Sequence, residues 1–397
     1  MESAGRVRDE GIKRPGAFTA APLSPADIQE AIDFVLQKID GNLGPFSGRF
    51  PAPSSIECVY PAIDNTEWTS AFWTGMLWLA YEVTGSPKYR KGAESQLGSY
   101  RERVDKRIRT DTHDLGFLYT LSCVAAFRLT GDRTARDTAL MAAGLLAGRF
   151  HEKAGIIQAW GDLSDPAQSG RMIIDCCMNL PLLHWASGQT GDGRYAGIAG
   201  SHARRAMENL VREDASSYHT YYMDVETGEP RFGKTAQGLS DDSCWSRGQA
   251  WGVYGFALAR LRANDAAALD IAVKMADYFL NRLPEDRVCY WDLDFTEGPE
   301  ERDSSAAAIA ACGVLEAARH LPASEAKKDI YGNAARFIVK SLADRYTTRD
   351  VPGSNGVLMH AVYSKPGREG VDECCIWGDY FYFEALVRLF KDWEPYW

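Results

Sequence analysis

Two aspartates in apolar segments are the residues of this sequence best suited to acid–base chemistry. Asp175 lies in the run Arg-Met-Ile-Ile-Asp-Cys-Cys-Met-Asn of residues 171–179, and Asp114 lies in Thr-His-Asp-Leu-Gly-Phe-Leu-Tyr of residues 112–119. Burial disfavours an ionised carboxylate and raises its pKa, which suits a group that donates a proton near neutral pH. We therefore expect both aspartates to face one cavity as an active site. The alternative is that each only caps a helix.

An arginine stands at the start of a third segment, Trp-Ser-Arg-Gly-Gln-Ala-Trp-Gly at residues 245–252. Arg247 and Trp251 have the i, i+4 spacing that places two side chains on one face of a helix. A cation at the start of a helix is unfavourable to the helix dipole. Arg247 is therefore expected to meet an anion, which is either a carboxylate of the protein or an anionic substrate.

Aromatic residues are frequent in the loops and at the predicted helix starts. Aromatic faces beside Asp, His, Arg and Gln suit sugar rings, which present apolar C–H faces and hydroxyl rims. Trp73 and Trp78 lie deep in a helical pattern and are expected in the core. Trp160 lies in a loop and is a candidate for contact with a ligand.

The composition argues against several classes of protein. The 397 residues carry a net charge of -10, which disfavours nucleic acid or an anionic membrane as a general partner. There is no H-E-x-x-H pair, G-x-S-x-G elbow, phosphate-binding loop or dinucleotide fingerprint, so no metal and no nucleotide cofactor is expected. The nine Cys include no C-x-x-C pair, no apolar signal segment is present, and no apolar run approaches membrane-spanning length. We expect a cytoplasmic protein with reduced thiols.

Helical hairpins repeat along the chain. Helices that open near Trp68, Asp114 and Asp175 each end at a Thr-Gly pair, at residues 84–85, 130–131 and 190–191, and another helix follows at once. Glycine just past a helix end is a common C-cap, so the recurring pair marks an internal repeat. With weaker caps, the pattern continues to give about twelve helices and no strand-rich block. The remaining helices are expected near 25–39, 245–262, 265–282, 303–320, 324–344 and 376–393.

Pro181 interrupts the third hairpin. Proline lacks an N–H group and is tolerated only in the first turn of a straight helix. The sequence leaves two alternatives: Pro181 kinks a helix that begins before Asp175, or Asn179 caps a helix that starts at Leu180.

Long and short connections alternate along the chain. The short ones leave the apolar helices that carry the motifs, and long loops lead into them, which indicates a functional role for those loops. A double ring of six hairpins places all the long loops at one end, whereas two separate helical domains explain only the number of helices. We therefore expect one all-α domain over residues 25–397, preceded by a tail or surface arm at 1–24. The long loops are 40–66, 106–111, 151–172, 213–243, 283–302 and 346–375.

From about residue 31 onward, the chain resembles the unsaturated glucuronyl hydrolases of glycoside hydrolase family 88. Several segments carry the resemblance in this order: Asn-Thr-Glu-Trp-Thr-Ser-Ala-Phe-Trp from 65, His-Asp-Leu-Gly-Phe-Leu-Tyr from 113, Gly-Ile-Ile-Gln-Ala-Trp-Gly from 155, Ile-Ile-Asp-Cys from 173, Asp-Ala-Ser-Ser-Tyr-His-Thr from 214, Trp-Ser-Arg-Gly-Gln-Ala-Trp-Gly from 245, and Ile-Trp-Gly-Asp-Tyr from 376. The resemblance implies an (α/α)6 barrel without a cofactor.

The resemblance also implies an uncommon reaction. The substrates are oligosaccharides left by polysaccharide lyases, whose non-reducing uronic acid carries a C4=C5 double bond. Hydration of this vinyl ether gives a hemiketal that opens and releases the next sugar, without the covalent nucleophile of many glycosidases. The implied general acid and base is Asp175, with Asp114 as the second essential acid. The implied substrate-binding residues are Trp68, His113, Trp160, His219, Gln237, Arg247 and Trp251.

The sequence leaves some alternatives open. Unsaturated rhamnogalacturonyl hydrolases share the barrel and similar chemistry, and a non-catalytic glycan-binding toroid or a sugar epimerase would use a similar fold. The Trp-Ser-Arg-Gly-Gln-Ala-Trp segment favours the glucuronyl group, and the two aspartates argue against the toroid. The last long loop aligns poorly, so neither the parent polysaccharide nor a preference for sulfated substrates is predicted. We expect a monomer or a weak homo-oligomer.

Overall fold

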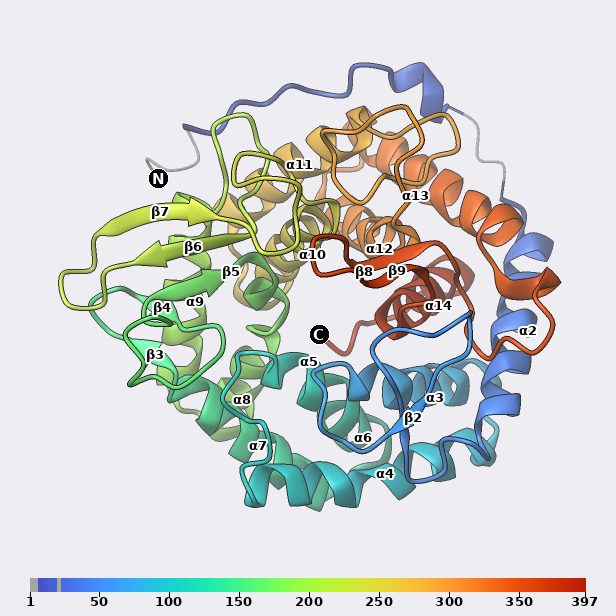
Figure 1. Ribbon diagram of the computed structural model, residues 1–397, viewed down its shortest axis with the longest axis horizontal. Coiled ribbons are helices and arrows are strands. Elements are labelled where there is room, and N and C mark those ends of the chain that lie inside the picture. Colours follow the sequence, from blue (N-terminus) through green and yellow to red (C-terminus); the bar gives the residue numbers. More distant parts are fainter. Residues whose placement is uncertain (1–5, 20–22) are drawn as a thin grey trace.

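Two concentric rings of helices make up the computed structural model, which describes residues 6–19 and 23–397 (Figure 1). The inner ring consists of α3 (Ser70–Thr84), the continuous segment α5 (Leu115–Tyr119), η2 (Thr120–Val124) and α6 (Ala125–Thr130), then α8 (Pro181–Thr190), α10 (Ser246–Ala263), α12 (Ser304–His320) and α14 (Ile376–Phe390). The outer ring consists of α2 (Pro25–Asn42), α4 (Pro87–Asp105), α7 (Arg133–Ala147), α9 (Gly193–Asn209), α11 (Ala266–Asn281) and α13 (Ala326–Arg345). The first outer helix, α2, packs against the last inner one, α14, and closes the ring. The predicted (α/α)6 barrel is confirmed.

The helices of the two rings differ in how much of their surface is buried. Nearly every residue of α12 is buried, which is typical of a helix with neighbours on all sides. Its partner α13 buries only one stripe, which includes Tyr331, Ile338 and Leu342. Glycines bring the inner helices close together, since a Cβ atom added to Gly313 of α12 would lie 2.9 Å from the Cα atom of Tyr254 in α10.

The hairpin turns follow the predicted repeat. Gly85, Gly131 and Gly191 all adopt the left-handed conformation, with φ of 69°, 75° and 75°, and each N–H group donates to the carbonyl oxygen of a residue in the last helical turn. The side chains of Asp132 and Asp192 then accept hydrogen bonds from the first N–H groups of α7 and α9. C-cap glycine and N-cap aspartate therefore fix the short connections.

The prediction that Asp175 opens a helix was wrong. Asp175 lies in a short 3₁₀ helix, η3 (Ile174–Met178), and α8 begins separately at Pro181 with Leu180 as its N-cap. Because Pro181 has no N–H group, it occupies the first helical position instead of a position inside a longer helix.

Short strands form within the long loops, at the end of the ring where the inner helices begin (Figure 1). They make four small antiparallel sheets and no strand-rich domain in the described residues. The pairs are β1 (Phe50–Pro51) with β2 (Ala62–Ile63), and β3 (Phe150–His151) with β4 (Ile156–Ile157). A three-stranded sheet combines β5 (Arg171–Ile173), β6 (Thr220–Met223) and β7 (Pro230–Lys234), and β8 (Ala361–Ser364) pairs with β9 (Glu369–Glu373).

The segment expected as a tail or arm, 1–24, is described except for residues 1–5 and 20–22. Residues 6–19 run along the outside of the ring and include a 3₁₀ turn, η1 (Pro15–Phe18) (Figure 1). Glu10 forms an ion pair of 2.7 Å with Arg282, next to the end of α11. No helix among the described residues has the length and apolar character to cross a bilayer.

Gly313→Ala is expected to destabilise the protein, because the added methyl group meets the backbone of Tyr254. Overpacking of this kind costs about 1–3 kcal/mol. Gly332→Ala in α13 is the matched control, since a Cβ atom there meets nothing within 4 Å and alanine is favoured over glycine in a helix by about 0.5–1 kcal/mol. Thermal unfolding of both variants should show a lower midpoint for the first and an equal or higher one for the second. Equal midpoints would contradict tight contact between α10 and α12.

Candidate active site

A cavity of about 690 Å³ opens where the inner helices begin. Eight of the nine residues predicted for the site line this cavity: Trp68, Asp114, Trp160, Asp175, His219, Gln237, Arg247 and Trp251. The ninth, His113, is fully buried behind the wall, next to both aspartates. Sequence reasoning missed further lining residues. Most of them lie in or next to the long loops, where no periodic pattern singles them out, and Arg103 lies near the end of α4. They include Glu67, Arg103, Arg109, Asp111, Tyr363 and Glu369.

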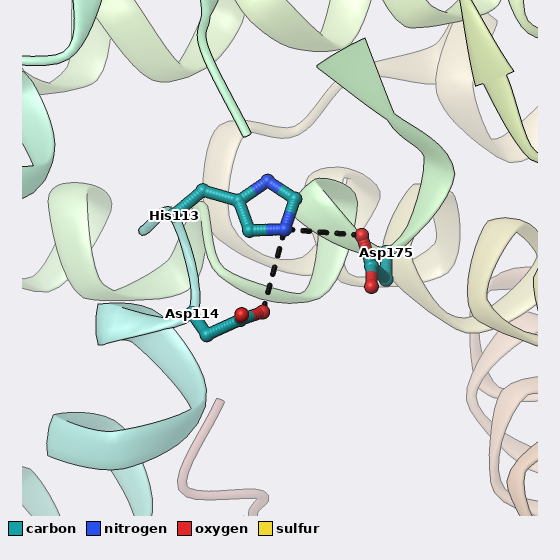
Figure 2. A group of neighbouring side chains, drawn as sticks. All are labelled: His113, Asp114 and Asp175. Atoms are coloured by element: carbon teal, nitrogen blue, oxygen red, sulfur yellow. Dashed lines mark ion pairs between the residues drawn. The ribbon is translucent and has the colours of Figure 1, made fainter. Parts of the chain in front are cut away.

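His113 lies between the two aspartates (Figure 2). Its Nε2 atom is 3.3 Å from Oδ1 of Asp114 and 3.3 Å from Oδ1 of Asp175. The two carboxylate side chains are 12% and 19% exposed, toward the cavity. One imidazole therefore links the two acids that the sequence placed at the centre of the site.

The charges of this cluster are coupled. Burial alone would lower the pKa of His113, but the Asp114 and Asp175 carboxylates outweigh burial and hold the pKa of His113 well above its ordinary value. Burial alone would raise the pKa of Asp114, but the positive charge of His113 and the hydroxyl group of Thr112 outweigh it and lower that pKa. An imidazolium next to an ionised Asp114 is therefore the stable arrangement near neutral pH.

Local hydrogen bonds fix Asp114. The Thr112 hydroxyl donates to Oδ2 of Asp114 over 2.7 Å and accepts from the Asp114 N–H group over 3.1 Å. The N–H group of His113 donates to the carbonyl oxygen of Ala159 over 2.6 Å, which ties this segment to the Trp160 loop. Asp114 occupies the N-cap position of α5, yet its side chain makes no capping hydrogen bond. Helix capping therefore does not account for the carboxylate.

Asn179 connects the segments of the two acids. Its side chain is buried, Oδ1 accepts a hydrogen bond of 2.7 Å from the N–H group of Phe117, and Nδ2 donates over 3.2 Å to the carbonyl oxygen of Asp175. Gly116 allows the close approach, since a Cβ atom there would lie 2.3 Å from the Cα atom of Asn179. The amide thus sets the distance between α5 and η3, and through them the position of both carboxylates.

His219 is held as a neutral hydrogen-bond donor. Its Nδ1 atom accepts a hydrogen bond of 2.9 Å from the N–H group of Ala236, so the ring proton is on Nε2. The ring packs against Trp245 with 4.5 Å between centroids. Burial, together with the cations Arg247 and Arg171, lowers the pKa of His219 to about 3.

Arg247 meets a carboxylate of the protein. It forms an ion pair of 3.2 Å with Asp303, and both side chains are almost completely buried. The guanidinium also donates to the carbonyl oxygens of Val362 and Tyr363, and to Oε1 of Gln237 over 3.1 Å. The first of the two alternatives from the sequence is therefore realised, although Arg247 still borders the cavity.

Trp68 and Trp160 both line the cavity. Trp68 stacks on Trp377 with 5.2 Å between ring centroids, and its Nε1–H group donates to the hydroxyl of Tyr363 over 3.1 Å. Trp160 is 40% exposed at the rim, and the guanidinium of Arg171 lies 4.1 Å from its ring centroid. The core residues Trp73 and Trp78 are buried, as expected. The cavity thus presents aromatic surfaces beside polar groups, as a sugar ring requires.

The ring of His219 should stay neutral between about pH 5 and 8, because burial removes the charged form. In the unfolded chain its pKa returns to about 6.5, so unfolding takes up a proton at lower pH and this histidine reduces stability as the pH falls from about 6.5 to about 3. The test is to measure the 15N NMR chemical shifts of the histidine ring nitrogens as a function of pH. The signal of His219 is identified as the one that is missing from the spectrum of His219→Asn. A midpoint near that of a free histidine would contradict the buried geometry.

The chain is similar to known proteins over nearly its full length. Residues 46–321 match the family described as Glycosyl Hydrolase Family 88. The chain is 48% identical over 394 residues to the unsaturated chondroitin disaccharide hydrolase of Streptococcus pneumoniae (strain ATCC BAA-255 / R6), covering 99% of each protein. It is 47% identical over 370 residues to the unsaturated glucuronyl hydrolase of Bacillus sp. (strain GL1), covering 93% of this chain and 98% of that protein. The crystal structure of unsaturated glucuronyl hydrolase from Streptococcus agalactiae superposes with a TM-score of 0.96 at 44% identity, covering 98% of this chain and 99% of that one. The chain belongs to glycoside hydrolase family 88.

Proposed function

We propose that this protein is an unsaturated glucuronyl hydrolase in which Asp175 carries the proton. The substrate is a lyase-generated oligosaccharide whose terminal uronic acid has a C4=C5 double bond. One observation supports the proposal above all: two carboxylates, joined through a single buried imidazole, border a cavity lined with aromatic residues. An acid with charge partners beside such a cavity supports proton transfer to a bound sugar ring.

The reaction is a net addition of water. Asp175 donates its proton to C4, and positive charge develops at C5 and the ring oxygen. A water molecule adds at C5 and gives a proton back to the Asp175 carboxylate, which restores the acid for the next cycle. The resulting hemiketal opens, breaks the bond to the next sugar, and leaves the uronic acid as a keto acid.

Asp114 and His113 control the charge at this centre. Ionised Asp114 faces the cavity and serves to accept hydrogen bonds from ring hydroxyls. His113 is too deeply buried to reach a substrate, so its role is to hold a positive charge between the two carboxylates. The three groups keep their positions during catalysis because Asn179 connects the backbone segments that carry the acids.

Binding groups surround this centre. The Nε2–H group of His219 is the donor left over for the substrate, since Nδ1 is already occupied. Arg247 fixes the orientation of the Gln237 amide, because its guanidinium donates a hydrogen bond to Oε1. The NH₂ group of Gln237 is then free to donate to the sugar. Trp68, Trp160 and Trp251 supply the aromatic surfaces.

The substrate class follows from the relatives. One relative is named unsaturated chondroitin disaccharide hydrolase. A mutant of the Streptococcus agalactiae enzyme was crystallised with dGlcA-GalNAc6S, and this structure superposes with a TM-score of 0.88 at 41% identity. We therefore assign unsaturated disaccharides of the glycosaminoglycan type to this protein. The nine cysteines are all unpaired, which supports a place in the reducing cytoplasm, where we expect a monomer or a weak homo-oligomer.

Asp175→Asn should fold normally and lose nearly all turnover, because an amide neither donates the proton to C4 nor accepts one from water. General acid–base groups contribute about 10²–10⁴-fold, and the only proton carrier lies at or above that range. The assay follows the loss of ultraviolet absorbance of the C4=C5 bond in an unsaturated chondroitin disaccharide. Asp392→Asn is the control, since that side chain is 100% exposed. Turnover of Asp175→Asn within a few-fold of wild type would remove Asp175 from this role.

Asn179→Ala should lower kcat at least about tenfold and change KM much less, because the variant releases the position of the two acids but leaves the binding groups His219, Gln237 and the tryptophans in place. It also leaves the Phe117 N–H group unpaired, which costs about 1–3 kcal/mol of stability. Asn179→Asp keeps an oxygen acceptor for Phe117 but buries a carboxyl group against the carbonyl oxygen of Asp175, so its stability should fall as well. A lower thermal midpoint with an unchanged kcat would show that Asn179 has only a structural role.

A further inference from the structure

The His113, Asp114 and Asp175 cluster has the spacing of a transition-metal site. Two ligand atoms of one tetrahedral zinc ion, each bonded at about 2.0–2.1 Å, lie about 3.3 Å apart. The Nε2 atom of His113 is 3.3 Å from an oxygen of each carboxylate. All three ligand atoms lie within 4.8 Å of one another. Figure 2 shows both carboxylates turned toward the same ring nitrogen.

The same atoms lack hydrogen-bond partners. Within the described part of the chain, neither ring nitrogen of His113 nor Oδ1 of Asp175 makes a hydrogen bond of normal geometry, although all three atoms are buried. Buried polar groups of folded proteins are usually paired, and each exception calls for an explanation. The Nε2 atom of His113 and Oδ1 of Asp175 face each other across 3.3 Å as an ion pair, without a hydrogen bond of normal geometry (Figure 2).

The ligand types select the kind of metal. One imidazole nitrogen and two carboxylate oxygens suit Zn²⁺ and its neighbours in the first transition series. Mg²⁺ and Ca²⁺ prefer six or more oxygen ligands and gain little from a nitrogen. Asp114 and Asp175 both border the cavity, so water completes the coordination from that side.

We propose that His113, Asp114 and Asp175 bind one Zn²⁺ ion, and that the bound ion inhibits the enzyme. Nε2 of the imidazolium and the carboxyl group of Asp175 each release a proton to solvent, and the metal binds the lone pairs that this frees, so the exchange involves no change of oxidation state. Once both carboxylates are metal ligands, Asp175 has no proton to give to C4. The inhibitory part rests on the proposed function, whereas the binding part does not.

Isothermal titration of the full chain with ZnCl₂ tests binding directly. We expect one ion per protein at this site, and at least about tenfold weaker binding in Asp175→Asn and in His113→Gln, since each removes a ligand. Asp175 borders the cavity, so Asp175→Asn keeps the test valid if His113→Gln does not fold. MgCl₂ should give no binding at this site. Wild-type affinity in Asp175→Asn would overturn the proposal.

Two variants control for zinc binding elsewhere. His360 is an exposed histidine paired with Asp372 over 2.6 Å, and Cys58 is the only one of the nine cysteines that is not buried. His360→Gln and Cys58→Ser should both retain the affinity of the wild type. Loss of binding in either one, with full binding in Asp175→Asn, would place the ion on the surface and overturn the site.

Activity measurements separate the two parts. With a metal-free protein that hydrates the unsaturated disaccharide, saturating Zn²⁺ should abolish turnover, and a chelator should restore it. Turnover that persists at saturation would overturn inhibition. If the metal-free protein shows no turnover on any unsaturated disaccharide but binds zinc through Asp175, the proposed function fails and the metal site stands.

Discussion

The buried imidazole between two carboxylates is the interaction on which the rest of the structure depends. An isolated carboxylate is costly to bury, and two side by side repel each other. His113 offsets both costs, because its charge attracts Asp114 and Asp175 over equal distances of 3.3 Å. The arrangement requires residues from two different hairpins to meet within hydrogen-bond range. The side chain of Asn179 links the two backbone segments by hydrogen bonds. Gly116 has no side chain and therefore lets Asn179 come close enough to form them.

The barrel explains why such a cluster forms at one end only. At the other end of the ring, glycine C-caps and aspartate N-caps close short connections. The long loops lead into the inner helices and carry the small sheets (Figure 1). Of these sheets, the one with β5 and the one formed by β8 and β9 contribute residues to the wall of the cavity. Arg247 shows how the two parts are connected, because from α10 it reaches Asp303 at the start of α12 and the backbone of β8. Its charge is thus used to hold the last long loop onto the ring.

The features of the fold and the site that could be predicted from the sequence are those that leave a local pattern in it. The hairpins followed from caps and periodicity, and Asp114 and Asp175 stood out as single charges in apolar runs. The 3₁₀ turn at Asp175 was missed because residues 171–179 have too few positions to show a period, and only Pro181 limited the helix. The sequence shows that His113 precedes Asp114, but not that its ring turns toward Asp175, which lies on another hairpin. The Asp303 partner of Arg247 was equally hidden, since ion pairs distant in sequence leave no local pattern.

Proton chemistry and metal binding at this centre are two results of one geometry. In the state that donates a proton, an imidazolium, an ionised Asp114 and a protonated Asp175 have a net charge of zero. A neutral imidazole and a divalent ion with the two carboxylates also have a net charge of zero. The metal therefore leaves the net charge of the centre unchanged, but it occupies the carboxylate of Asp175 that would otherwise carry the proton. A proton held by His113 lets the enzyme keep both carboxylates close without a metal, and leaves Asp175 able to exchange its proton with substrate and water.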